Sequence, residues 1–250
     1  MPLLVNLLKM PKYPSPFYDM QVSVITPTYQ RRAFIPILIE LYRNQSFPKD
    51  RMEWLILDDG RDSVADLFEE ASKTIPNIRY YYMDEKMRIG TKRNWLNDHA
   101  CGAIRIAMDD DDYYPPTRVS SVVTAFQQNP RIDLAGSSQM NLFFLDTQSV
   151  HTLGPYGPRH ATNGTMAWRK SYSDAHRYSE FVTKGEESSF LEDYRHPMIQ
   201  LDPRDTILVI CHGDNTVDKS KLALRPSPHR LDELVAEPAI RSWYTGLKHC

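Results

Sequence analysis

The first half of the chain alternates short, continuous apolar runs with longer segments whose apolar residues recur at helical spacing. The apolar runs predict buried strands at 22–26, 54–57, 78–82 and 103–108. The intervening segments predict helices at 33–44, 63–71 (with Ser63 as N-cap), 91–100 and from Pro115 or Pro116 to 126. Strands without a polar face are typical of a parallel sheet covered by helices on both sides, so we expect an α/β fold with a mostly parallel central sheet.

The second half of the chain is less regular. Shorter apolar segments predict strands at 132–135, 139–145, 165–169 and 207–211. A short helix is expected within 190–195, and the two prolines of 224–229 favour a loop. The segment after Leu231 is compatible with a terminal helix that is interrupted at Pro238.

Composition narrows the class of protein. Of the 250 residues, 41% are hydrophobic and 25% charged, and the formal net charge of -2 argues against nucleic-acid binding through bulk positive charge. The cysteines Cys101, Cys211 and Cys250 are odd in number and form no CxxC, as expected in a reducing compartment. The sequence shows no signal peptide and no apolar run of membrane-spanning length, so we expect a cytoplasmic protein, soluble or peripheral at a membrane surface.

Four consecutive aspartates, from Asp109 to Asp112, follow the predicted strand at 103–108. Adjacent carboxylates repel one another, and their concentration costs free energy unless a positive charge neutralises them. An acidic strand end in a crevice can bind a hard divalent cation through its oxygen atoms. The alternative interpretation is a solvated acidic turn.

Two more polar clusters follow predicted strands. Thr26-Pro27-Thr28 ends the first strand and Asp58-Asp59 ends the second. In a parallel sheet, ligands bind beyond the carboxyl ends of the strands, so the three clusters should converge on one crevice. Each of these two also has a purely structural interpretation, because proline ends strands and Asp-Gly favours turns.

Five motifs, taken in order, resemble those of the family 2 glycosyltransferases. They are VSVITPTY at 22–29, LDDG at 57–60, GTKRN at 90–94, MDDDD at 108–112 and ED at 192–193. The resemblance extends from about Gln21 to Asn215. It implies a GT-A (Rossmann-like) single domain, a nucleoside-diphosphate-sugar donor and an inverting mechanism.

The resemblance also implies a metal site. Asp109 and Asp111 correspond to the Asp-x-Asp pair of the family, in which the first acid lies near the ribose and the second binds Mn²⁺ or Mg²⁺. We expect Asp111 to be the main ligand, with help from Asp109 and His212, although a histidine here can also be purely structural. Asp110 and Asp112 are expected to be supporting residues, and the register among the four acids is open by one residue.

The nucleotide of the donor is expected to contact the other polar motifs. In the resembling family, the end of the first strand lines the base pocket and the acids after the second strand read the nucleoside. The residues expected to bind the nucleotide sugar are Thr26, Pro27, Thr28, Asp58, Asp59, Lys92, Arg93, Asn94, Asp109 and Asp110. The helix start near Gly90 favours an anion, and a solvated basic face is the alternative.

An inverting transfer needs a general base that takes the proton of the acceptor hydroxyl. The resemblance assigns this step to the pair Glu192-Asp193, and we expect Asp193 to act, with Glu192 as the second choice. Glu186 and Glu187, after Gly185, are competitors. A helix-capping acid pair is the structural alternative.

The expected organisation is an N-terminal extension at 1–20, a GT-A domain at 21–220 and a C-terminal tail at 221–250 that can be helical. The domain would comprise a nucleotide-binding half, 21–115, and an acceptor half, 116–220. We expect metal-dependent transfer from a UDP-, GDP- or dTDP-sugar to a glycan, glycolipid or glycoprotein, with no nucleic-acid partner. The alternatives are a nucleotidyltransferase, which would call for a Gly-rich loop after the first strand, and an inactive nucleotide- or carbohydrate-binding module.

Overall fold

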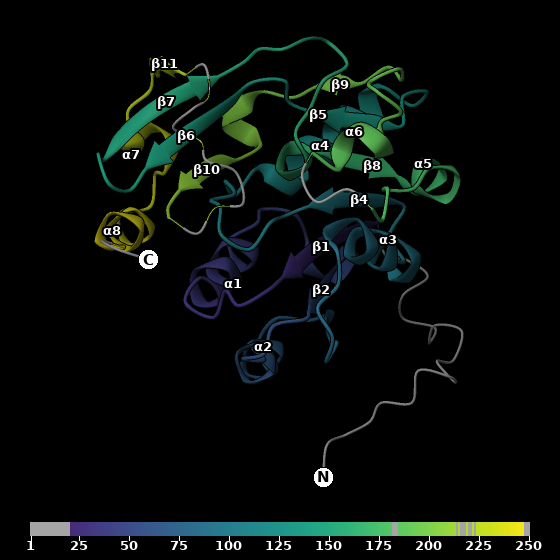
Figure 1. Ribbon diagram of the computed structural model, residues 1–250, viewed down its shortest axis with the longest axis horizontal. Coiled ribbons are helices and arrows are strands. Elements are labelled where there is room, and N and C mark those ends of the chain that lie inside the picture. The colour runs from purple at the N-terminus through teal and green to yellow at the C-terminus, as the bar shows by residue number, and fades with distance from the viewer. Residues whose placement is uncertain are drawn as a thin grey trace.

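The computed structural model describes residues 21–181, 185–213, 215, 219, 222 and 224–247, so the expected N-terminal extension lies outside the described residues. A seven-stranded sheet with the order β3-β2-β1-β4-β8-β5-β9 forms the centre of the molecule (Figure 1). Its strands are β1 (Val22–Thr28), β2 (Met52–Asp58), β3 (Ile78–Tyr82), β4 (Ile104–Ala107), β5 (Leu134–Gly136), β8 (Ala167–Arg169) and β9 (Ile199–Gln200). Neighbouring strands are parallel except at β8, which runs antiparallel to β4 and β5. The expected α/β fold with a mostly parallel sheet is confirmed.

The central strands are buried because helices cover both faces of the sheet. In β1, Val22 and Val24 belong to one apolar cluster and Ile25 belongs to another, as the alternation of side chains along a strand requires. Helices α1, α2 and α4 contribute to the first cluster and α3 contributes to the second. These helices are α1 (Ile35–Arg43), α2 (Ala65–Ser72), α3 (Ile89–His99) and α4 (Arg118–Gln128). The start of α2 differs by one residue from the prediction, because Val64 and not Ser63 is its N-cap.

A second, four-stranded sheet lies beside the first, and the sequence pattern does not predict it as a separate sheet (Figure 1). Its order is β10-β6-β7-β11, and its strands are β6 (Met140–Phe144), β7 (Ser149–Leu153), β10 (Leu208–Cys211) and β11 (Arg225–Pro226). The apolar runs of β6 and β10 are predicted, whereas β7 is half-buried along most of its length and lacks such a run. The expected loop at 224–229 contains the two-residue strand β11.

The remaining helices are short. They are α5 (Lys170–Ala175), α6 (Glu187–Phe190), α7 (Leu231–Leu234), α8 (Pro238–Gly246) and the 3₁₀ turns Lys49–Arg51, Asn163–Thr165 and Pro203–Asp205. Proline suits the first turn of a helix, and α8 begins at Pro238, so the predicted interruption there is confirmed. Every helix among the described residues is too short or too polar to cross a lipid bilayer.

The helix expected at 190–195 is wrong. Helix α6 ends at Phe190, and a turn follows in which three consecutive residues have positive φ. These residues are Glu192 at 46°, Asp193 at 56° and Tyr194 at 61°. Such residues cannot continue a right-handed helix, so the acid pair lies in a left-handed turn instead.

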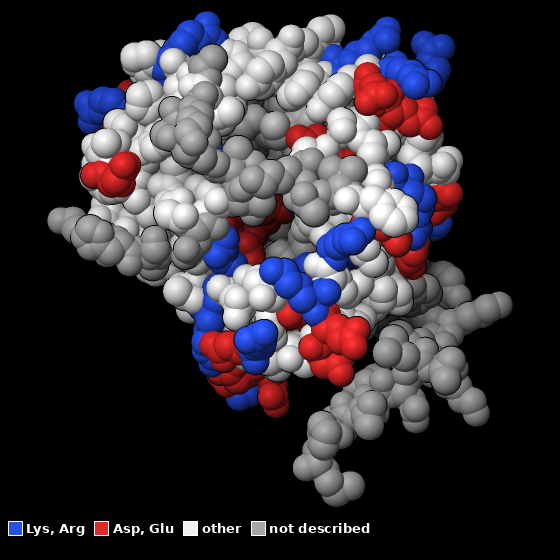
Figure 2. Space-filling view, in the orientation of Figure 1, with Lys and Arg blue, Asp and Glu red and all other residues white. Residues whose placement is uncertain are grey.

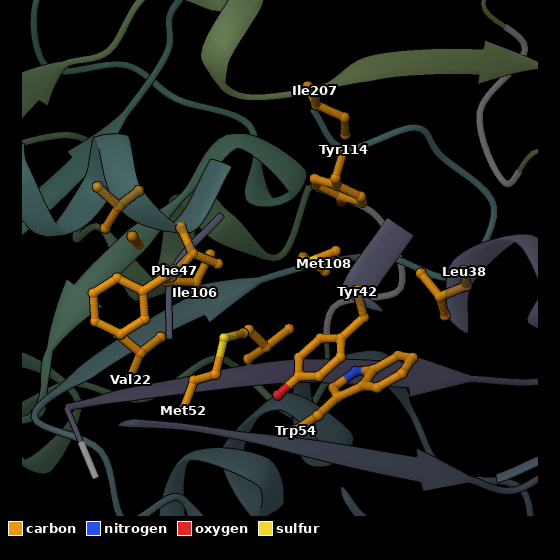
Figure 3. Close-up of a cluster of buried hydrophobic side chains, with 14 of the residues drawn as sticks. Val22, Leu38, Tyr42, Phe47, Met52, Trp54, Ile106, Met108, Tyr114 and Ile207 are labelled. Atoms are coloured by element: carbon orange, nitrogen blue, oxygen red, sulfur yellow. The ribbon is translucent and has the colours of Figure 1, made fainter. Parts of the chain in front are cut away.

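The largest apolar cluster joins the two sheets. Figure 3 shows Tyr42 of α1 lying over Trp54 of β2, and their ring centroids are 4.4 Å apart. Trp54 also meets Phe68 of α2 edge-on, with centroids 5.2 Å apart. The same cluster extends to Met140 of β6 and Val209 of β10. The second sheet therefore shares a core with the first.

Phe68 is fully buried between α2 and the sheet. We expect Phe68→Ala to lower the free energy of unfolding by about 3–5 kcal/mol, because it removes apolar contacts and leaves a cavity. Urea unfolding followed by circular dichroism measures the change. Phe181→Ala is the matched control, because Phe181 is 84% exposed and its loss should change stability by no more than about 0.5 kcal/mol. Equal losses in the two variants would contradict the core role of Phe68.

Candidate active site

A cavity of about 790 Å³ lies at the carboxyl ends of β1 and β4. Its lining includes Pro27 and Thr28 of β1, the acidic run at 109–112, the start of α3 and residues 185–187 at the start of α6. Apolar side chains of β6 and β10 also line it. Figure 2 shows acidic side chains deep in a hollow of this face, with Lys and Arg side chains at its rim. The polar clusters that follow β1 and β4 therefore meet in one place.

The two acids of the Asp-x-Asp pair have different partners. Asp109 accepts a hydrogen bond from Nη1 of Arg93 at 3.1 Å. Oδ2 of Asp111 lies 3.1 Å from Nε2 of His212, whose side chain is 1% exposed. Asp111 and His212 are therefore neighbours, and Asp109 and Asp111 both line the cavity, but among the described residues these three do not form a group whose ligand atoms all lie within 4.8 Å of one another.

Arg31 adds positive charge to this cluster. Its Nε lies 3.5 Å from Asp111 and 4.0 Å from Asp110. Burial acts to raise the pKa of Asp111, but the hydrogen bond with His212 and the charge of Arg31 outweigh it, so that pKa is lowered. Burial and the charge of Asp111 together raise the pKa of Asp110 to about 7. The positive charge around Asp110 is therefore too small to keep its pKa in the ordinary range of an aspartate.

Asp112 and two tyrosines fix the backbone of the run. The carboxylate of Asp112 accepts a hydrogen bond from the backbone N–H of Ile210 at 2.8 Å. The hydroxyl of Tyr244 donates to the carbonyl of Asp112 at 3.1 Å, and the N–H of Asp109 donates to the hydroxyl of Tyr114 at 2.7 Å. These are the contacts of a supporting residue, as the sequence predicts for Asp112.

The chemistry of the cluster fits a divalent cation. Asp109 and Asp111 offer carboxylate oxygens, which suit Mn²⁺ and Mg²⁺, and His212 offers an imidazole nitrogen, which Mn²⁺ accepts more readily than Mg²⁺ does. The Asp111 carboxylate can only accept a hydrogen bond, so Nε2 of His212 carries a proton that a metal ion bound there would replace, and the buried Nδ1 has no hydrogen-bond partner among the described residues. Burial and the charge of Asp111 raise the pKa of Asp110, and a cation bound beside it would favour its ionised form.

Asp58 does not line the cavity. Its carboxylate accepts hydrogen bonds from the N–H groups of Gly60 and Val64, at 2.8 and 3.1 Å, and from the hydroxyl of Tyr80 at 2.6 Å. Three donors from its own fold therefore occupy the side chain and organise the turn that leads into α2. These contacts agree with the structural interpretation of Asp58 as a turn residue. They give no support to the expectation that its carboxylate binds the nucleoside.

Asp59 pairs with Lys92. The ammonium group of Lys92 donates to the Asp59 carboxylate and, at 2.8 Å, to the carbonyl of Thr28. The N–H of Met87 also donates to Asp59, at 2.6 Å. Burial lowers the pKa of Lys92 in spite of this pairing, since the two side chains are only 5% and 0% exposed. The pair ties α3 to the ends of β1 and β2, and Lys92 also lines the cavity.

Two other residues expected to bind the nucleotide have structural partners and do not line the cavity. The buried hydroxyl of Thr26 donates to the carbonyl of Met108 at 2.7 Å and accepts from the indole N–H of Trp54 at 2.9 Å. The side chain of Asn94 exchanges two hydrogen bonds of 2.9 Å with the backbone of Tyr178. Both side chains hold elements together around the cavity.

The acid pair Glu192-Asp193 also lies outside the cavity lining. Both residues are exposed, and the carboxylate of Glu192 faces His176 and His196. The physical reason is the left-handed turn at 192–194, which stands where the sequence predicts a helix. The geometry does not support the expectation that Asp193 or Glu192 acts as the general base.

The acids that line this side of the cavity are Glu186 and Glu187. Glu186 is buried and accepts a hydrogen bond from Nε of Arg93 at 2.9 Å. Glu187 is half-buried, and no other described residue donates a hydrogen bond to its carboxylate. Burial raises the pKa of Glu187. In the sequence, Glu186 and Glu187 can be recognised as a pair of acids that directly follows Gly185 at the start of a helix.

A family model described as glycosyl transferase family 2 matches residues 23–169. The chain belongs to glycosyltransferase family 2. The matched segment extends from β1 to β8 and includes Arg93 and the acidic run at 109–112. It ends before Glu187 and His212, so the family match by itself does not assign these two residues.

Two curated relatives match part of the chain. The protein named "Putative teichuronic acid biosynthesis glycosyltransferase TuaG" of Bacillus subtilis (strain 168) is 32% identical over 92 residues, or 36% of each protein. The glycosyltransferase AglE of Haloferax volcanii is 29% identical over 91 residues, which are 36% of this chain and 30% of AglE. The chain thus matches only about a third of the length of these relatives.

Solved structures show the same fold at low sequence identity. Staphylococcus aureus TarS 1-349 in complex with UDP-GlcNAc has a TM-score of 0.65 and 16% identity, covering 78% of this chain and 60% of that one. The mannosyltransferase PcManGT of Pyrobaculum calidifontis, in complex with GDP-Man and Mn²⁺, has a TM-score of 0.60 and 15% identity over 78% of this chain and 58% of its own. The expected GT-A fold is confirmed.

Lys92 and Asp59 form a buried ion pair, and breaking it should be costly. We expect Lys92→Met to lower the free energy of unfolding by about 3–5 kcal/mol, because it leaves the Asp59 carboxylate buried without its counter-charge. The double variant Lys92→Met/Asp59→Asn removes both charges and should recover part of the loss. Urea unfolding of wild type, both single variants and the double variant measures the coupling. Strictly additive losses would contradict a direct structural pair.

Proposed function

We propose that the protein is an inverting, metal-dependent glycosyltransferase that moves a sugar from a nucleoside-diphosphate sugar to an acceptor hydroxyl. The observation that carries this proposal is the shared cavity of the acidic run, Arg93 and Glu187, beside the buried His212. A nucleotide sugar has a diphosphate that requires positive charge and an anomeric carbon that requires an activated acceptor. The cavity offers groups for both needs.

Arg93 connects the two sides of the proposed site. It donates to Asp109 through Nη1 and to Glu186 through Nε, at 3.1 and 2.9 Å. Its side chain is only 5% exposed, so its charge is held in the cavity wall and not in solvent. Fixed positive charge in a site shielded from water stabilises negative charge that develops on a leaving diphosphate.

Asp109, Asp111 and His212 would hold the divalent metal, Mn²⁺ or Mg²⁺. When bound, such an ion neutralises the diphosphate and acts as a Lewis acid on the leaving group. The Mn²⁺ named with PcManGT supports a divalent metal at the level of the fold. The chain itself contributes orientation, because the bonds of Asp112 to Ile210 and of Asp109 to a tyrosine keep the acidic run in one conformation.

Glu187 is the proposed general base. It lines the cavity, its carboxylate receives no hydrogen bond from another described residue, and its raised pKa makes it a stronger base than an ordinary glutamate. It would take the proton of the acceptor hydroxyl while that oxygen attacks the anomeric carbon. The bond from that carbon to the diphosphate breaks in the same displacement, which inverts the configuration.

The donor is proposed to be a UDP-, GDP- or dTDP-sugar, and the acceptor a glycan, glycolipid or glycoprotein. The nucleotides named with TarS and PcManGT, UDP-GlcNAc and GDP-Man, support this class of donor at the level of the fold. The side chains of Met140, Leu142 and Val209 form an apolar part of the cavity lining. Such a surface suits the apolar face of a sugar ring.

We expect Glu187→Gln to lower the rate of transfer by about 10²–10⁴-fold, the usual contribution of a general base, with little change in donor binding. The rate is measured as donor consumption with a panel of UDP-, GDP- and dTDP-sugars and Mn²⁺. The base acts only when ionised, and burial raises the pKa of Glu187, so the wild-type rate should fall as the pH is lowered through that raised pKa.

Asp193→Asn is the matched control for Glu187→Gln, because it neutralises a nearby acid that lies outside the cavity lining. It should keep the wild-type rate. Loss of transfer in Asp193→Asn together with an active Glu187→Gln would show that Asp193 is the base and that our assignment is wrong.

Nucleotide binding tests the metal site separately. Loss of even an outer partner of a bound metal costs about 10–100-fold in affinity, so Asp111→Asn should weaken Mn²⁺-dependent binding of UDP or GDP by at least that much. Isothermal titration calorimetry with and without Mn²⁺ measures the effect. Asp62→Asn, at a position whose side chain is 68% exposed, is the control and should bind normally. Nucleotide binding that is equally tight without Mn²⁺ would contradict the metal-dependent mechanism.

A further inference from the structure

Three metal-ligating side chains meet on the surface, outside the lining of the active-site cavity. His176 follows α5, and Glu192 and His196 lie in the segment after α6. One ligand atom from each of the three lies within 4.8 Å of the other two. None of them lines the cavity, and the proposed transfer reaction uses none of them.

The distances are close to those that one metal ion requires. Ligand atoms about 2.0–2.2 Å from a tetrahedral zinc ion lie about 3.3–3.6 Å from one another. Nε2 of His196 is 3.1 Å from Oε2 of Glu192, and Nε2 of His176 is 3.9 Å from Oε1 of the same carboxylate. The centroids of the two imidazole rings are 4.9 Å apart. The ligand atoms thus lie within 4.8 Å of one another, and a bound ion would replace the proton that Nε2 of His196 donates to Glu192.

The surroundings orient His176 as a ligand. Its Nδ1 lies 2.9 Å from the backbone carbonyl oxygen of Tyr172, which can only accept a hydrogen bond. Nδ1 therefore carries the proton of the neutral ring, and Nε2 presents its lone pair toward Glu192. Metal-bound histidines commonly donate their other N–H to a carbonyl in this way. The ring of Tyr172 also stacks on His176 at 4.0 Å and meets His196 edge-on at 5.3 Å.

The backbone of the turn after α6 presents the other two ligands. Positive φ at Glu192, Asp193 and Tyr194 is unusual for consecutive residues that are not glycine. The N–H of Asp193 donates to the carbonyl of Ser188 at 2.8 Å and so closes the turn against α6. In this conformation the Glu192 carboxylate faces both histidines, one of them four residues further along the chain.

We propose that His176, Glu192 and His196 form a second metal site that takes Zn²⁺ or a similar transition-metal ion, with the fourth position open to water. Two imidazoles and one carboxylate are a ligand set that zinc accepts. The ion would join the end of α5 to the turn after α6. Because α6 begins at Glu187, the site would clamp the segment that forms one wall of the active-site cavity.

The test is a zinc titration of the full chain in the Asp111→Asn background, which weakens the proposed active-site metal centre. Isothermal titration calorimetry with ZnCl₂ counts the bound ions. We expect His196→Ala and Glu192→Gln each to remove one equivalent of bound Zn²⁺ from this background. His229→Ala is the matched control, because His229 faces Glu233 at 3.7 Å in the same i,i+4 arrangement but belongs to no three-ligand group among the described residues.

Thermal unfolding gives a second readout. Zinc should raise the melting temperature of the Asp111→Asn chain and of its His229→Ala derivative, but not that of the His196→Ala derivative. Circular dichroism without metal checks that each variant folds, and His176→Gln replaces His196→Ala if that variant does not. The proposal is overturned if the Asp111→Asn chain binds no zinc, or if the ligand variants bind as much zinc as His229→Ala. Because the readout is zinc binding and not transfer, failure here leaves the proposed function untouched.

Discussion

The concentration of negative charge at the end of β4 is the constraint on which the site depends. Residues 109–112 place four carboxylates in a largely buried position, where each charge requires a partner. The partners come from distant parts of the chain: Arg31 follows β1, Arg93 lies in α3, and Ile210 and His212 belong to or follow β10. Neutralising one acidic run therefore brings the two sheets and a helix together around one cavity.

The number of hydrogen bonds that an acid receives separates the structural acids from those available for chemistry. Asp58 accepts from three donors of its own fold and Asp59 is paired with Lys92, so these side chains are committed to the structure around the cavity. Asp111 contacts Arg31, which lines the cavity, and His212, and Glu187 receives no hydrogen bond from another described residue. An acid whose oxygens are already satisfied cannot easily accept a substrate proton or a metal, which favours the second group.

The sequence alone cannot make this distinction between structural acids and acids available for chemistry. The strands and helices of the first half could be predicted because burial on both faces of β1 and β2 produces continuous apolar runs. The half-buried strand β7 produces no such run, so the second sheet was harder to predict. Asp58-Asp59 and residues 109–112 look alike in the sequence, since both are acids after an apolar strand. Only the neighbouring donors in three dimensions separate a turn from a ligand set. The position of Glu192-Asp193 outside the cavity lining could not be predicted for a related reason, because nothing in these residue types indicates a left-handed turn.

The segment at 185–196 contributes residues both to the cavity lining and to the surface group of His176, Glu192 and His196. The anchoring of α6 in the core explains how one segment can do both. The ring of Phe190 is fully buried and stacks on Tyr178 with centroids 4.1 Å apart, and the hydroxyl of Tyr172 donates to the Phe190 carbonyl at 2.8 Å. On one side of this anchor Glu187 lines the cavity, and on the other Glu192 faces two histidines. As the proposed general base, Glu187 would have to be held to within about 0.5 Å of its productive position, and a single helical turn cannot supply that rigidity alone. The buried ring of Phe190 anchors this segment to the core. A metal ion bound by the turn after α6 would restrain the same segment from the solvent side.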